Sequence, residues 1–281
     1  MPYKILEKTR LNSVIWRIVV DAPCVAKNVR CGKFVIVKID EKGERIPLTV
    51  NDSDAPKGTV TIIFQEAGTT TKRLACLKAG DCLSDLLGPL GKATDFGRAG
   101  KVVLVAGGVG IAEIFPVAKY AEEAGNKVVI IIGGRTKELV ILEKELKEYS
   151  DELIIATDDG SYGIKGLVTG PLKELINKEK FDLCYCVGPD IMMKVVSETT
   201  KARGLKTLVS LDANMVDATG MCGTCRVIVA GQTKFVCVDG PEFDGHLVDW
   251  DLFLKRQKRF AAEEKESLEH FSSAHKNCIY K

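Results

Sequence analysis

The stretch KVVLVAGGVG, residues 101–110, decides the fold that we predict for this chain. Residues 101–106 are almost continuously apolar, which is typical of a strand buried on both faces of a parallel sheet. The glycines that follow suit a strand that turns sharply into a helix. Glycine lets a ligand approach the backbone closely, and the helix N-terminus offers free N–H groups to a phosphate. The loop therefore indicates either a tight turn or a nucleotide phosphate site.

Downstream of this stretch, strand-like and helix-like segments alternate, which is the signature of a doubly wound α/β domain. We expect strands at 127–132, 152–157, 183–187 and 206–211, and helices at 114–124, 138–149, 170–177 and 190–202. Ligands of such sheets bind beyond the carboxyl ends of the strands. The residues at those ends that we expect to contact a pyridine nucleotide are Gly107, Gly108, Gly110, Gly134, Arg135, Thr136, Asp158, Asp159, Gly188 and Pro189.

Each of these assignments has a plainer alternative. The third glycine of the Rossmann fingerprint is missing, and no acidic residue closes the second strand. Arg135 and Lys137 could pair with an adenosine phosphate or be solvated loop charges. Asp158 and Asp159 could accept hydrogen bonds from ribose hydroxyls or belong to a turn, since Asp-Gly favours turns. Cys186 could lie beside a reactive ring or be a buried structural cysteine.

Upstream of residue 100 the chain is predicted to form strands. Residues 14–20, 34–39 and 59–64 are short and rich in β-branched side chains, with Gly, Pro, Asn or Asp between them. One helix is expected at 71–77. This spacing predicts a small antiparallel barrel or sandwich ahead of the α/β domain.

Four residues near the C-terminus indicate a metal centre, namely Asp217, Cys222, Cys225 and Cys237. The cysteines occupy the last three positions of the plant-type iron–sulfur spacing, and the first position falls on Asp217. Clusters need soft thiolate ligands, although a carboxylate can ligate ferric iron as a harder donor. Zinc normally recruits a second Cys-x-x-Cys or paired histidines, and a redox dithiol sits at a strand-to-helix junction. The pattern favours a cluster over both.

Composition excludes several classes of partner. The 281 residues are 46% apolar and 28% charged, with a net charge of +2. This balance gives no electrostatic reason to expect binding to nucleic acid or to a membrane surface. No apolar run is long enough to span a membrane, and the first ten residues lack the apolar core of a signal peptide. We therefore expect a cytoplasmic protein. Residues 250–269 are expected to form a charged helical tail.

The order of these parts resembles the ferredoxin–NADP reductase superfamily across nearly the whole chain. The resemblance rests on RIPLT at 45–49, GTTT at 68–71, AGGVG at 106–110, CVGP at 186–189 and the cysteine segment. Within the superfamily, the chain is similar to dihydroorotate dehydrogenase electron-transfer subunits and their relatives. These include the small subunits of NADH-dependent reduced ferredoxin:NADP oxidoreductases, also described as sulfide dehydrogenase small subunits. Asp217 and the long tail point to the latter branch, because dihydroorotate dehydrogenase subunits carry four cysteines at the cluster.

The resemblance implies a division of the chain and a set of cofactors. It implies an FAD-binding antiparallel β-barrel at 1–98, an NAD(P)-binding α/β domain at 99–211, a [2Fe–2S] segment at 212–248 and a helical tail at 249–281 that contacts a partner. FAD is then expected to be held by Arg45, Pro47, Leu48, Thr49, Gly68, Thr69, Thr70 and Thr71. Thr49 would lie near the flavin N5, and Thr49 and Cys186 are the expected reactive-site residues.

The carriers imply a function. A nicotinamide gives two electrons as hydride, a cluster takes one at a time, and FAD can do both, so we expect FAD between NAD(H) and the cluster. The resemblance implies a heterodimer with a larger flavoprotein carrying further FAD and [4Fe–4S] clusters, an indirect link to ferredoxin, and flavin-based electron bifurcation. Two alternative functions are electron transfer in dihydroorotate oxidation and the reduction of sulfur or polysulfide. A zinc-stabilised interaction module is the alternative of a different class. The choice between NAD and NADP stays open.

Overall fold

The β-branched segments before residue 100 form a seven-stranded antiparallel sheet in the computed structural model, which describes residues 3–274. The strand order is β6-β1-β2-β5-β4-β3-β7. The bounds are β1 Tyr3–Arg10, β2 Ile15–Asp21, β3 Phe34–Lys38, β4 Arg45–Asp54, β5 Thr59–Gln65, β6 Cys82–Leu83 and β7 Asp85–Leu90. The two edge strands, β6 and β7, are separated in the chain by Ser84 alone, so the sheet nearly closes into the predicted barrel.

Alternation of side chains fills the inside of this barrel. Ile18 and Val20 of β2 and Ile62 and Phe64 of β5 are at most 1% exposed, as expected where every second residue of a strand faces the core. Two short helices cover its ends, α1 at Pro23–Asn28 and α2 at Thr69–Cys76.

Residues 101–107 form the central strand of a second sheet, ordered β11-β10-β9-β8-β12-β13-β16. The strands are β8 Lys101–Gly107, β9 Lys127–Gly134, β10 Glu152–Thr157, β11 Ile164–Lys165, β12 Leu183–Val187, β13 Thr207–Ser210 and β16 Glu242–Asp244. All pairs are parallel except β13 with β16. Val102 to Ala106 are fully buried, and each Val or Leu so buried stabilises the fold by about 1.5–3 kcal/mol.

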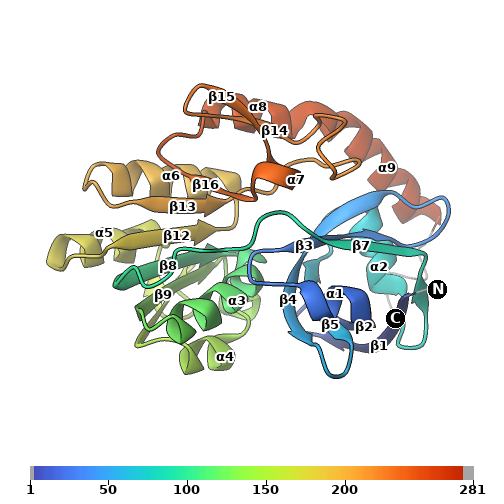
Figure 1. The fold of residues 1–281 in the computed structure, drawn as a ribbon, viewed down its shortest axis with the longest axis horizontal. Helices are drawn as coiled ribbons and strands as arrows, with labels where there is room; N and C mark the ends of the chain where they lie inside the picture. The colour runs from blue at the N-terminus through green and yellow to red at the C-terminus, as the bar shows by residue number, and fades with distance from the viewer. Residues whose placement is uncertain (1–2, 275–281) are drawn as a thin grey trace.

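Helices cover both faces of this sheet, which confirms the doubly wound domain (Figure 1). Helices α3, Gly110–Glu123, and α4, Glu143–Glu148, pack in one apolar cluster with side chains of β8, β9 and β12. Helices α5, Thr169–Lys178, and α6, Asp190–Lys201, pack in another cluster against the opposite face.

The helix expected at 138–149 is wrong as a single element. It is divided into a 3-10 turn at Lys137–Leu139 and α4, and between them Leu142 has a positive φ of 56°. The apolar residues there decide the path, because Ile141 is 5% exposed and joins the same core cluster as Leu146. Tertiary burial therefore overrides a helix-forming composition.

The C-terminal segment lies above both sheets in Figure 1. It contains the hairpin of β14, Arg226–Val229, with β15, Gln232–Phe235, and then α7, Val236–Asp239. Helix α8, Trp250–Gln257, contacts β14 and α6, and α9, Ala261–Ala274, follows a 3-10 turn at Lys258–Phe260 and contacts α2. Within residues 3–274, we find no helix with the length and hydropathy needed to cross a bilayer.

The tail has both buried and exposed apolar side chains. Phe253 of α8 is 2% exposed and belongs to the core of the α/β domain, beside Trp250. Leu252 and Phe260 are 39% and 38% exposed. Any contact of the predicted tail with a partner would therefore rest on the latter two side chains and not on Phe253.

Candidate functional site

The sheet reverses its strand order between β8 and β12, and the glycine-rich loops meet at this point. A Cβ on Gly110 would lie 2.7 Å from the carbonyl oxygen of Val187, and one on Gly188 would lie 2.7 Å from that of Gly107. Gly188 also has φ of 143°, which other residues rarely adopt. Close backbone approach therefore requires glycine here. Crevices at such reversals are where open α/β sheets bind ligands.

The backbone around Gly108 is open, so a ligand fits beside it. A Cβ added at Gly108 would meet no atom within 4 Å, and its φ is 60°. The first turn of α3 begins two residues later, with its N–H groups at the same edge of the sheet. These features match the chemistry that a dinucleotide phosphate needs.

The other predicted strand ends lie beside this loop. The Gly108 N–H donates to the Gly133 carbonyl at 3.0 Å, and the Asp158 N–H donates to the Gly134 carbonyl at 3.1 Å. Four strand ends named from the sequence thus lie along one edge of the sheet. Arg135 is exposed there. Contact of these residues with a nucleotide stays a prediction.

Asp159 and Cys186 have local roles in the structure. The Asp159 carboxylate accepts hydrogen bonds from the Ser161 N–H and hydroxyl at 2.9 and 2.7 Å, and these lower its pKa. Cys186 is fully buried in the sheet, and burial raises its pKa well above the usual value. Turn formation and core packing account for both residues, and a role beside the nucleotide stays a prediction.

The residues expected to hold FAD lie on β4 and at the start of α2. Arg45 pairs with Asp85 at 2.8 Å, and Pro47 lies opposite Ile36 in the β3–β4 pairing. Gly68 caps α2, and a Cβ there would meet no atom within 4 Å. A phosphate can therefore reach the N-terminus of α2 without a steric obstacle at Gly68.

The start of α2 is also tied to other elements by its threonines. Thr70 donates to Glu44 at 3.1 Å, and Thr71 accepts from the Gly68 N–H at 3.1 Å. The hydroxyls of Thr69 and Ser267, the latter on α9, lie 2.9 Å apart. The predicted pyrophosphate loop is thus held by both β4-side and C-terminal contacts.

The predicted metal ligands lie in two pairs. The Cys222 N–H donates to Asp217 Oδ2 at 2.9 Å, and the Cys237 N–H donates to Cys225 Sγ at 3.4 Å. A cluster with two irons needs ligands to both metal ions, so two adjacent pairs fit it better than four ligands around one ion. Within residues 3–274, no group of three or more His, Cys, Asp and Glu side chains is placed to hold a metal ion.

The two pairs differ in their surroundings. The N–H groups of Thr219 and Cys222 lower the pKa of Asp217, which favours the anionic ligand. Hydrogen bonds from Thr224 lower the pKa of the exposed Cys222 thiol. Cys225 and Cys237 are buried, and desolvation followed by contact with Cys225 raises the pKa of Cys237 to about 12. The local hydrogen bonds therefore favour the thiolate form of Cys222, the form in which a cysteine binds a metal.

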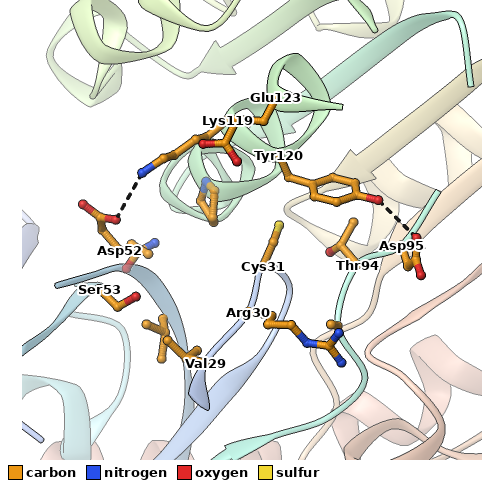
Figure 2. Close-up of a pocket in the computed structure, with 14 residues that line it drawn as sticks. Val29, Arg30, Cys31, Asp52, Ser53, Thr94, Asp95, Lys119, Tyr120 and Glu123 are labelled. Atoms are coloured by element: carbon orange, nitrogen blue, oxygen red, sulfur yellow. Dashed lines mark hydrogen bonds and ion pairs between the residues drawn. The ribbon is translucent and has the colours of Figure 1, made fainter. Parts of the chain in front are cut away.

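A separate cavity of about 410 Å³ lies between α3, strand β4 and the segment that joins the two sheets (Figure 2). Lys119 reaches across it to Asp52 at 3.9 Å, and the Tyr120 hydroxyl donates to Asp95 at 3.2 Å. None of the residues predicted from the sequence lines it. The cavity therefore lies at the junction between the antiparallel sheet and the α/β domain.

Two residues of this junction were missed from the sequence, Glu113 and Asn51. Glu113 lies in the first turn of α3, where Asn51 of β4 donates to the neighbouring Ala112 carbonyl at 2.8 Å. A single charge in the otherwise apolar run from Ile111 to Ala118 was the available signal for Glu113. Nothing in the sequence marks Asn51.

Two family models match the chain. Residues 104–198 match the oxidoreductase NAD-binding domain. Residues 212–249 match the iron–sulfur cluster binding domain of dihydroorotate dehydrogenase B. The second match includes all four predicted metal ligands.

Curated relatives match along most of their length. A dihydroorotate dehydrogenase B (NAD+) electron transfer subunit homolog of Thermotoga maritima is 46% identical over 95% of each chain. A probable dihydroorotate dehydrogenase B (NAD+) electron transfer subunit of Pyrococcus furiosus is 36% identical, covering 79% of this chain and 86% of its own. The relatives are thus described as subunits.

Solved structures agree with the fold. A chain of the NADH-dependent reduced ferredoxin–NADP oxidoreductase, studied for flavin-based electron bifurcation, is 45% identical with a TM-score of 0.91 and covers 96% of this chain and 98% of its own. The cytochrome P450 reductase GcoB of Amycolatopsis has a TM-score of 0.62 at 18% identity, covering 72% and 65%. The latter supports the fold alone.

Proposed function

Because this chain belongs to the family of dihydroorotate dehydrogenase B electron transfer subunits and their homologues, we propose that it transfers electrons between NAD(H), FAD and a [2Fe–2S] cluster. The observation that carries the proposal is the arrangement of Asp217 with Cys222 and of Cys225 with Cys237 within the matched cluster domain. Two ligand pairs suit two irons.

The flavin and nucleotide sites complete the set of carriers. Residues 45–49 on β4 and 68–71 at α2 would hold FAD, and the glycine loops of β8 and β12 would hold NAD(H). FAD, when bound, exchanges hydride with a nicotinamide and single electrons with a cluster. The chain's own contribution is to orient these groups and to exclude water from between them. Support comes from the open backbone at Gly68 and Gly108.

A larger partner subunit follows from the same family membership. The chain has a site for one two-electron and one one-electron carrier, so the electrons must leave it through another protein. The chain of similar structure belongs to an NADH-dependent reduced ferredoxin–NADP oxidoreductase. We propose that the partner is a flavoprotein with iron–sulfur clusters, that it forms a heterodimer with this chain and reaches ferredoxin indirectly, and that the pair bifurcates electrons.

A second function is favoured by the cluster-domain match. That domain model is the one of dihydroorotate dehydrogenase B, and several relatives are described as its electron transfer subunits. In that role the partner would oxidise dihydroorotate. Asp217 in place of a cysteine favours the first function. Assays of the purified complex with NADH, NADPH, reduced ferredoxin and dihydroorotate as donors separate the two.

The experiment that tests the proposal is an absorption spectrum of anaerobically purified protein, with iron, sulfide and flavin measured per chain. We expect a yellow-brown protein in which the measured contents are roughly two irons and one FAD per chain. A colourless protein containing zinc would contradict the proposal and support an interaction module instead. Loss of flavin alone, with iron and sulfide intact, would contradict only the FAD assignment.

A further inference from the structure

The end of helix α8 contacts the loop that carries two of the predicted cluster ligands. The Nη2 atom of Arg256 donates a hydrogen bond to the carbonyl oxygen of Thr224 at 3.1 Å, and Nη2 of Arg259 donates to the same oxygen at 3.3 Å. A carbonyl oxygen has two lone pairs, so these two donors satisfy it fully. Thr224 lies between Cys222 and Cys225 in the Cys-x-x-Cys sequence. Two cationic side chains therefore hold the backbone between two predicted ligands.

This loop has no regular structure of its own. Residues 211–225, which join β13 to β14, form no helix or strand. Gly220 and Gly223 have positive φ angles of 87° and 68°, and the Thr224 N–H donates to Cys222 Sγ at 3.5 Å. Without a helical or strand ladder, the position of the loop depends on the side chains that reach it from neighbouring elements.

Helix α8 is itself fixed to the α/β domain, so it can hold the loop in one place. Trp250 and Phe253 pack in the core of that domain and are 7% and 2% exposed. The side-chain amide of Gln257 donates to Asp190 of α6 at 3.2 Å and to the Asp212 carbonyl at 2.5 Å. The last turn of α8 is thus tied to α6 and to the start of the cluster segment. Groups placed on an anchored helix position a site more precisely than groups on a loop.

The arginines also bring positive charge close to the predicted ligands. Arg226, the residue after Cys225, lines a cavity of about 220 Å³ together with Arg256. In the described part of the chain, no carboxylate forms an ion pair with Arg226, Arg256 or Arg259. Arg259 is exposed and Arg256 is half-buried, so salt screens the charge of Arg256 less. The positive charge beside the loop is therefore not compensated by the chain itself.

Positive charge at this place affects a cluster that gains an electron. One electron from the reduced flavin adds one negative charge to the cluster, and nearby cations stabilise that charge. We propose, on the basis of the proposed function, that Arg256 and Arg259 act as positioning residues for the cluster. They hold the loop between Cys222 and Cys225 in place, and they raise the reduction potential of the cluster.

The effect of charge is tested with Arg256→Gln, which removes one positive charge and keeps an amide donor. Arg256→Lys keeps the charge. Arg203→Gln is the matched control, because it removes an exposed charge that precedes β13, whereas the cluster segment follows that strand. In a redox titration of the full-length, iron-loaded protein followed by EPR, we expect Arg256→Gln to favour the oxidised cluster about threefold more than the wild type, a fall of roughly 30 mV. Arg256→Lys and Arg203→Gln should keep the wild-type potential.

The hold on the loop is tested by the loss of iron, a readout that does not depend on turnover. Each protein is mixed anaerobically with an iron chelator, and the release of iron is followed by absorbance. We expect the Arg256→Gln, Arg259→Gln double variant to release iron about fivefold faster than the wild type, because the Thr224 carbonyl loses both donors. Arg203→Gln should release iron at the wild-type rate. Arg259→Gln alone keeps the test valid where Arg256→Gln does not fold, since Arg259 is exposed.

Iron content separates this proposal from the proposed function. Iron and sulfide are measured per chain in every protein before the titrations. Wild-type protein that holds no iron would overturn the proposed function, and the role of the arginines with it. Fully loaded Arg256→Gln and Arg259→Gln with the potential and the iron release of the wild type would overturn the role of the arginines alone. An equal fall in potential in Arg203→Gln would overturn it too, because net charge and not position would then set the potential.

Discussion

At the scale of single residues, Asp217 is the ligand that sets this chain apart. Its carboxylate accepts N–H groups of Thr219 and Cys222 at 2.9 Å each, so it is fixed and anionic before any metal binds. We expect Asp217→Ala to lose the cluster or hold it weakly, and Asp217→Cys to keep it with a changed reduction potential, because ligand identity tunes the potential. Iron and sulfide content with EPR spectra check this. An unaltered cluster signal in Asp217→Ala would remove Asp217 from the ligand set.

Glu242 is a second residue whose contribution, here to the stability of the fold, can be measured. It accepts hydrogen bonds from the hydroxyls of Tyr185 at 2.8 Å and of Thr94, and these join β16, β12 and the segment between the sheets. Burial raises its pKa, so the folded protein binds this proton more tightly than the unfolded chain. The free energy of unfolding should therefore fall as pH rises through the unfolded pKa towards the folded one, and stay low above it.

Glu242→Gln should remove this loss while keeping an acceptor for both hydroxyls. We expect the variant to gain stability relative to the wild type at pH 8 and not at pH 4.5, in urea unfolding followed by tryptophan fluorescence. Glu242→Ala should instead destabilise at both pH values by about 1–3 kcal/mol for each hydroxyl left without an acceptor. Glu41→Gln, with a side chain 95% exposed, is the control and should change neither. Equal pH dependence in all four proteins would contradict the role of burial.

At the scale of elements, the sequence predicts those strands and helices that the spacing of apolar residues and the local composition determine. The parallel strands at 101–106, 127–132, 152–157 and 183–187 are confirmed because continuous apolar runs have few other solutions. The helix at 114–124 begins at Gly110 instead, since glycine at a helix start gives no propensity signal. The division of 138–149 could not be predicted, because it depends on the core that Ile141 enters.

The candidate site likewise contains some features that the sequence predicts and others that it does not. The strand-end residues could be grouped from the sequence because the topology of a doubly wound sheet fixes where strand ends lie. The contact of Asn51 with the Ala112 carbonyl could not be predicted, because it joins two domains whose relative placement no local pattern encodes. The same holds for Thr94 and Glu242, which lie 148 residues apart in the chain.

The packing of α3 against β12 can be tested at the first residue of the helix. A Cβ on Gly110 would lie 2.7 Å from the Val187 carbonyl oxygen and 2.8 Å from the Gly188 Cα, both in backbone that cannot rotate away. We expect Gly110→Ala to cost about 1–3 kcal/mol of stability and to weaken NAD(H) binding, because α3 must move away from β12. Gly170→Ala in α5, where a Cβ meets no atom within 4 Å, is the control and should be neutral or stabilising. Urea unfolding and NADH titration of both variants check this; equal behaviour would contradict it.

At the scale of the whole molecule, the C-terminal segment connects all the sites. It carries the cluster ligands, adds β16 to the α/β sheet, packs Trp250 and Phe253 into that domain, and then sends α9 to α2. The carriers must sit close together for electrons to pass, so a segment that fixes one sheet to the other helps to hold them in place. The contact at α2 is the far end of this connection.

Helix α9 should therefore help to retain FAD. Phe271 is 6% exposed, and Ser267 lies 2.9 Å from the hydroxyl of Thr69 in the loop predicted to hold the FAD pyrophosphate. A chain ending at residue 260 should keep its cluster and lose FAD faster on gel filtration. Ser267→Ala should weaken FAD binding by about fivefold, the effect of one hydrogen bond of about 1 kcal/mol. Glu264→Ala, exposed on the same helix, should leave FAD binding unchanged. Tighter FAD binding in the shortened chain would mean that α9 competes with the cofactor for the start of α2, and would reverse the role assigned to it.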